Sequence, residues 1–138
     1  MNTVPEILVG KWTYRSFKSN PDLDTPFNDL RFGKGYIEIE DGPCEKLTGS
    51  IFGKGKSWEL DLNGSITYGN PFCVRFQGKG EVGAKKEEWI YDYVGYLIRD
   101  WPNGVDQRPA IVGSIVRTIP HSGKPAGVVA QWIAVKQD

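Results

Sequence analysis

Hydrophobic and polar residues alternate along most of this chain, in short segments that end at glycine, proline, asparagine or aspartate. The clearest segment runs from Trp58 to Tyr68, where apolar side chains at 58, 60, 62, 66 and 68 share one face. Residues 72–79 repeat the alternation after the turn at 69–71. A period of two residues is typical of a strand with one dry face and one wet face, and no helical period of 3.6 residues competes with it.

Extended along the chain, this pattern predicts eight strands at about 9–18, 29–41, 46–53, 57–69, 72–82, 87–101, 109–120 and 126–137. Most connections are short, which favours antiparallel pairing of neighbours. Closure into a barrel would hide both the apolar face and the two edge strands. We therefore predict one all-β domain over residues 1–138, an antiparallel up-and-down eight-stranded β-barrel, with a two-sheet sandwich as the alternative. The apolar residues change phase near Gly33-Lys34-Gly35, which predicts a β-bulge there.

Charge and cysteine content narrow the classes of function. Seventeen Lys and Arg residues balance seventeen Asp and Glu residues, which argues against non-specific nucleic-acid binding. No apolar run approaches the roughly 20 residues of a membrane span, and residues 1–8 do not resemble a signal peptide. Cys44 and Cys73 do not form a disulfide framework, so we expect free thiols in the cytoplasm. A single histidine and two distant thiols indicate no metal site, and no cofactor is expected.

The segment Gly10-Lys11-Trp12 opens the first expected strand. A Gly-x-Trp at the start of an eight-stranded meander resembles the calycin superfamily, which includes lipocalins, fatty-acid-binding proteins and avidins. The short hairpins look closest to avidin-like barrels. The resemblance implies that Trp12 closes one end of the barrel and that a basic side chain from a late strand packs across its ring. Arg117 or Lys136 can supply that group, and we expect Arg117 because its parity points it inward.

Small residues on the expected inner face suggest space in the lumen. Three alanines share a face of the strand at 126–137, and Gly95 and Gly113 lie within other strands. The interior of an eight-stranded barrel is either filled by side chains or just wide enough for one small ligand. We expect a cavity lined by aromatic residues, with ligand-binding candidates Tyr14, Tyr91, Tyr93 and Trp132. The alternative is that these rings fill the core.

Three polar residues are further ligand-binding candidates. Asp106 and Arg108 lie in the unusual loop 101–109, where they would orient a polar group at a barrel mouth. His121 follows Pro120 at a strand end, and histidine titrates near neutrality. Asp92 lies opposite Tyr91 and Tyr93 in parity, so we expect it to face outward. No catalytic motif stands out.

The expected strands 87–101, 109–120 and 126–137 carry large apolar side chains on both faces. Such strands predict an apolar patch on the outside of the barrel, and in soluble proteins such a patch usually marks an interface. We therefore expect a homo-oligomer formed through these three strands.

The sequence favours a small-molecule-binding barrel that holds a mainly apolar or aromatic ligand in its lumen. One alternative is a cofactor-free isomerase or cyclase that resembles allene oxide cyclase, which would use the lumen as its active site. The other is a structural or interaction protein with a filled barrel. Whether the chain is an enzyme stays open at this point.

Overall fold

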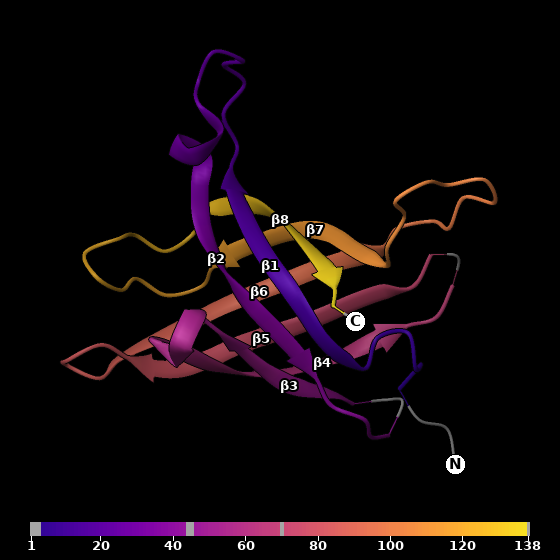
Figure 1. Cartoon of the computed structure of the whole chain (residues 1–138). Coiled ribbons are helices and arrows are strands. Elements are labelled where there is room, and N and C mark those ends of the chain that lie inside the picture. The colour runs from indigo at the N-terminus through magenta and orange to yellow at the C-terminus, as the bar shows by residue number, and fades with distance from the viewer. Residues whose placement is uncertain (1–3, 44–45, 70, 138) are drawn as a thin grey trace.

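The chain folds into a closed antiparallel β-barrel. The computed structural model describes residues 4–43, 46–69 and 71–137. Eight strands follow one another around the barrel in chain order, and β1 pairs with β8 to close it (Figure 1). The strands are β1 (Gly10–Lys18), β2 (Arg31–Ile39), β3 (Leu47–Phe52), β4 (Glu59–Thr67), β5 (Cys73–Val82), β6 (Glu87–Leu97), β7 (Ala110–Arg117) and β8 (Val129–Lys136). Two short 3₁₀ helices, η1 (Phe27–Leu30) and η2 (Lys54–Lys56), precede β2 and β4.

The predicted fold class is confirmed, and the sandwich alternative is wrong. All eight strands lie where the alternation places them, although each is shorter than expected and β2, β4, β6, β7 and β8 are each shorter by four residues. β6 ends at Leu97 because the chain then enters an exposed loop, and β8 begins only at Val129. Ala126 is consequently an exposed loop residue and contributes nothing to the inner face. Cys73 is a free thiol at the start of β5, whereas Cys44 lies outside the described residues.

A β-bulge in β2 lies next to the glycines where the phase change predicts it. Ser16 pairs with Gly33 and Phe17 with Arg31, so Phe32 is the extra residue. Phe32 and Ile37 have opposite parity in the sequence, yet Phe32 contacts the Tyr91 ring and Ile37 is buried in the core. The bulge therefore brings both side chains to the inner face.

One end of the barrel, which we call the closed end, is covered by the N-terminal segment 4–9. Val4 and Leu8 of this segment are buried there, and the Trp12 indole donates its Nε1–H to the Leu8 carbonyl at 2.9 Å. Lys136 covers the ring, with its Nζ 6.0 Å from the ring centre and 2.8 Å from the Ile7 carbonyl oxygen. Trp12 is fully buried, as the sequence predicts for a residue that closes the barrel.

The expectation that Arg117 covers Trp12 is wrong. Trp12 lies near the start of β1, and the register pairs it with Lys136 near the end of β8. β7 runs antiparallel to β8, so Arg117 at the end of β7 lies at the opposite end of the barrel. Its guanidinium packs on Phe32 and Tyr91 instead, with its carbon 5.0 Å and 6.0 Å from the two ring centres.

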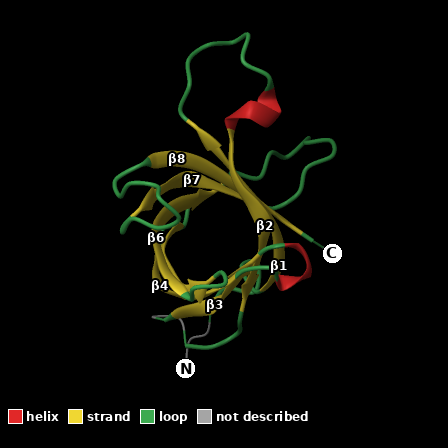
Figure 2. Cartoon of the chain, turned by 90° about the vertical axis from the view of Figure 1, so that its left-hand side faces the viewer, coloured by secondary structure: helices red, strands yellow, loops and turns green. Residues whose placement is uncertain are grey.

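The opposite end, which we call the open end, is where β5 turns into β6 and β7 into β8; Figure 2 views the ring of strands from this side. The segment between β1 and β2 also leaves the barrel here and projects away from it (Figures 1 and 2). Among the described residues, no helix has the length and apolar character needed to cross a membrane.

Aromatic rings fill the middle of the barrel. Trp132 is buried, and its indole contacts Tyr93 and Phe76 at ring-centre distances of 5.7 Å each. Gly95 makes this possible, because a Cβ there would lie 2.6 Å from Trp132 Cζ2. The sequence analysis takes Gly95 as a sign of empty space in the lumen. In the structure, the Trp132 indole occupies the space beside this glycine.

We predict that Trp12→Ala lowers the free energy of unfolding by about 3–5 kcal/mol, because it removes a fully buried ring and leaves a cavity. Lys11→Ala, one residue away on the exposed outer face, is the control and should cost less than about 1 kcal/mol. Urea unfolding followed by circular dichroism measures both. Equal stabilities for the two variants would contradict the role of Trp12 in closing the barrel.

Candidate functional site

A pocket of about 170 Å³ enters the lumen from the open end. Its floor and walls come from strands β1, β2, β4, β6 and β7 and from the segment after β7. The lining is mostly aromatic or apolar, with a few polar groups among the rings. The described lining residues are Tyr14, Ser16, Phe32, Gly33, Lys34, Trp58, Leu60, Trp89, Tyr91, Tyr93, Ile115, Arg117, His121 and Lys124.

The floor of the pocket is polar but uncharged. The Tyr14 hydroxyl is close enough to the hydroxyls of Tyr93 and Ser16 for both to act on its pKa, and Ser16 donates to the Gly33 carbonyl at 3.4 Å. Burial raises the pKa of Tyr14 to about 12 and raises that of Tyr93 well above its ordinary value. Both phenols therefore stay protonated at neutral pH, and each is able to donate or accept a hydrogen bond.

Tyr91 lies higher in the pocket, between a cation and an imidazole. Its hydroxyl shares a hydrogen bond with His121 Nε2 and accepts a long one of 3.5 Å from Arg117 Nε. Burial raises the pKa of Tyr91, and the bond to Arg117 and its charge oppose that effect. Arg117 Nη1 also donates to the Pro125 carbonyl at 3.1 Å, which ties the loop between β7 and β8 to the pocket.

His121 is held in a fixed orientation. Its ring stacks on Trp89 with the ring centres 4.1 Å apart, and Nδ1 lies 3.1 Å from Ser122 Oγ. Burial lowers the pKa of His121, the positive charge of Arg117 lowers it further, and Glu87 opposes them. The imidazole is therefore neutral at pH 7 and keeps one nitrogen as an acceptor.

Four of the seven sequence-predicted site residues come together here, namely Tyr14, Tyr91, Tyr93 and His121. Trp132 is not among the residues that line the pocket. It packs against Tyr93, and its Nε1–H donates to the carbonyls of Val94 and Ser114 at 3.1 and 2.9 Å. Asp92 is exposed on the outer face, where it accepts a bond from Thr118 Oγ1.

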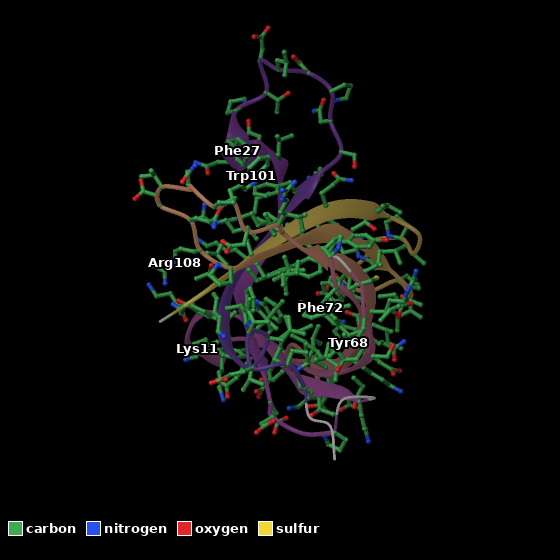
Figure 3. The ribbon with its side chains drawn as sticks, turned by 90° about the vertical axis from the view of Figure 1, so that its right-hand side faces the viewer. Lys11, Phe27, Tyr68, Phe72, Trp101 and Arg108 are labelled. Carbon is green, nitrogen blue, oxygen red and sulfur yellow. The ribbon has the colours of Figure 1, made fainter. Side chains whose placement is uncertain are left out.

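The structure places Asp106 and Arg108 at the closed end, away from this pocket. Figure 3 views that end and shows Arg108 outside the ring of strands. Arg108 Nη2 donates to the Lys136 carbonyl at 3.1 Å, and Asp106 adopts a positive φ of 56° in an exposed loop. A hollow of about 520 Å³ also lies at this end, but residues 98–109 that line part of it are all exposed. Of these two hollows, as lined by the described residues, the open-end pocket is the one that brings together the buried polar side chains of Ser16, Arg117 and His121.

Sequence reasoning missed several lining residues, of which Arg117, Trp58 and Trp89 matter most. Alternation places Trp58 and Trp89 on inward faces, but it does not predict that they lie together. In the structure their ring centres are 6.4 Å apart. The signal for Arg117 was present, because an arginine with inward parity needs a partner. That partner was assigned to the wrong end of the barrel.

Comparisons of the chain with models of protein families, with curated proteins and with solved structures find no match. Among the described residues, no cluster of three or more His, Cys, Asp or Glu side chains is arranged to hold a metal ion. Any function of this chain must therefore be inferred from the pocket itself.

We predict that the only imidazole of the chain titrates with a pKa below the ordinary 6.5. NMR titration of its ring protons measures this directly, and Arg117→Met should move the pKa upward because a positive charge is removed.

The unfolded chain takes up the proton near pH 6.5 and the folded chain only at lower pH, so stability falls as the pH drops through that window. His121→Gln should remove this part of the pH dependence of the melting temperature. A wild-type pKa at or above 6.5 would contradict the burial of the ring.

Proposed function

We propose that this barrel binds one small molecule with an aromatic ring in the open-end pocket. The observation that carries the proposal is the pocket lining, in which aromatic walls from Phe32, Trp58 and Trp89 surround the polar groups of Tyr14 and Tyr91. Ligand sites typically combine a mainly apolar lining with a few placed polar groups. A barrel of the calycin type, which the sequence resembles, is part of the same proposal.

The volume of the pocket limits the size of the ligand. An apolar cavity of about 150 Å³ holds a benzene ring, so 170 Å³ accommodates one ring with a small substituent. Deeper penetration of a ligand is blocked by the packed rings of Tyr93, Phe76 and Trp132. Larger molecules would have to extend out of the open end.

The test compares two glycine variants with the wild type. A Cβ at Gly33 would lie 3.3 Å from Ser16 Oγ, a hydroxyl that can rotate, so Gly33→Val should fold and fill the pocket. Gly42→Val is the matched control, because nothing lies within 4 Å of its Cβ position. A neutral single-ring probe, benzyl alcohol, should alter tryptophan fluorescence through Trp58 and Trp89. We expect Gly33→Val to weaken binding at least about 10-fold, or roughly 1.4 kcal/mol, and Gly42→Val to leave it unchanged. Absence of binding to the wild type would overturn the proposal.

A cofactor-free isomerase or cyclase is the second candidate, favoured by the hydrogen bond between Tyr91 and His121. A neutral imidazole beside a phenol is a suitable pair for moving a proton to or from a bound substrate. Acetophenone, a single-ring ketone whose methyl C–H protons are acidic enough to exchange, is incubated with the wild type and with His121→Gln in D2O to distinguish the two functions. If a C–H proton of the ligand exchanges with deuterium in the wild type but not in His121→Gln, the protein is a catalyst. If the ligand binds and none of its C–H protons exchanges, the protein is a binding protein.

We also propose that the outer face of β6, β7 and β8 binds a second copy of this chain. Tyr96, Val112 and Ile133 are cross-strand neighbours and form one apolar row across the three strands. Tyr96 is 47% exposed and Val112 is 37% exposed, which is unusual for side chains of this kind in adjacent positions. The next row contains Ser114 and Gln131, so the apolar surface is a stripe rather than a continuous patch.

We predict that the wild type sediments above the monomer mass at micromolar concentration. Val112→Lys and Ile133→Lys should shift it to monomer, because each would bury an unpaired charge in the interface. Ser65→Lys, which adds the same charge to an exposed position on β4, is the control and should not dissociate the oligomer. A wild type that sediments as a monomer would exclude this interface.

A further inference from the structure

Arg117 is a buried cation with no anionic partner among the residues that the structure describes. The side chain is only 6% exposed, and its hydrogen bonds go to the Tyr91 hydroxyl and the Pro125 carbonyl, both uncharged. Among the described residues, ion pairs join Lys56 to Glu59 and Lys79 to Glu88, and neither includes Arg117. A buried charge costs free energy unless it is paired, so this arrangement is expected where a partner arrives from outside.

The rest of the pocket adds positive charge and no negative charge. Lys34 and Lys124 belong to the lining, and the described lining contains no aspartate or glutamate. Glu87 is close enough to act on His121, but it is not part of that lining and its Oε2 accepts the Ser122 backbone N–H at 2.8 Å. The pocket therefore offers a cationic site at the edge of an aromatic chamber.

The donors of Arg117 have room for more bonds. A guanidinium carries five N–H groups in one plane, and the two hydrogen bonds to Tyr91 and Pro125 start from Nε and Nη1. A carboxylate matches this planar fork with two parallel bonds. A phosphate monoester carries nearly two negative charges, whereas the pocket has a single buried cation, because Lys34 and Lys124 are exposed.

We propose that the pocket binds a small aromatic carboxylic acid, with its carboxylate on Arg117 beside the Tyr91 hydroxyl and its ring against Trp58, Trp89 and Phe32. The inference rests on the proposed ring-binding function and adds the charge of the ligand to it. A second observation agrees with an occupant that accepts hydrogen bonds. Trp89, which lines the pocket, has a buried Nε1–H with no hydrogen-bond partner among the described residues.

The experiment compares acids with amides of nearly the same shape. Phenylacetate and phenylacetamide, and benzoate and benzamide, are titrated into the whole protein at pH 7 by calorimetry and by tryptophan fluorescence. We expect each acid to bind at least about 10-fold more tightly than its amide, as is typical of hydrogen bonds to a charged group. Arg117→Met should abolish this difference, so that each acid and its amide bind with equal affinity. Arg75→Met removes the same charge from an exposed position on β5 and should retain the difference.

The outcomes separate the two proposals. Equal affinities of the acids and the amides for the wild type would overturn the carboxylate assignment and leave ring binding intact. No binding of any of the four compounds would count against both. An acid preference that survives in Arg117→Met would also overturn the assignment. The wild-type comparison needs no variant, so the test stands even if Arg117→Met fails to fold. Arg117→Lys then supplies the second measurement. We expect it to show a smaller acid preference than the wild type, because lysine lacks the planar fork of arginine.

Discussion

The contact between Trp132 and Gly95 determines what the inside of this barrel contains. An eight-stranded barrel has an interior only wide enough for side chains or for one small ligand. The Trp132 indole crosses this interior from β8 to β6, and it fits because β6 has no side chain at position 95. Tyr93, Phe76 and Tyr14 then pack around the indole. These rings divide the lumen into a filled lower part and a short pocket above it.

The same packing explains the chemistry of the pocket floor. Tyr93 and Tyr14 pack edge to face with their ring centres 6.1 Å apart, and both rings are buried. Burial makes ionisation of these phenols costly, so the floor stays neutral. Charge is confined to the upper part of the pocket, where Arg117, Lys34 and Lys124 meet the solvent side. A ligand with an apolar body and one acidic end would match this gradient.

The inward cations at the two ends of the barrel, Lys136 and Arg117, differ in how many of their hydrogen-bond donors the protein uses. At the closed end, Lys136 Nζ donates to the carbonyls of Glu6 and Ile7 and lies against the Trp12 ring, so its donors are well used by the protein. At the open end, Arg117 has one carbonyl, one long bond to a hydroxyl and two rings. At the closed end, the hydrogen bonds of Lys136 stabilise the fold. At the open end, Arg117 has N–H groups beyond its two hydrogen bonds, and a ligand with an acceptor would be able to use them. This difference supports our proposal that the ligand site lies at the open end.

The sequence by itself determined the existence of the strands, their order and the face to which the side chains within them point. Period-two alternation does this because successive side chains on a strand point to opposite faces. It also indicated a bulge near Gly33-Lys34-Gly35, because a phase change on one strand must be absorbed by an extra residue, and the structure has that residue next to these glycines, at Phe32. Tyr14, Tyr91 and Tyr93 were identified as inward in this way.

Only the tertiary structure decided the height of each side chain along the barrel axis. Parity says that Arg117 points inward, but the register of β7 against β8 and of β8 against β1 decides that it lies opposite Trp12 rather than beside it. Height also separates Asp106 and Arg108 from His121, although all three lie in loops next to strands. The tertiary structure also decided how much of the lumen is filled. A glycine such as Gly95 leaves a space or admits a neighbouring ring, depending on which residue faces it. Such pairings join residues far apart in the chain, and alternation along a single strand carries no information about them.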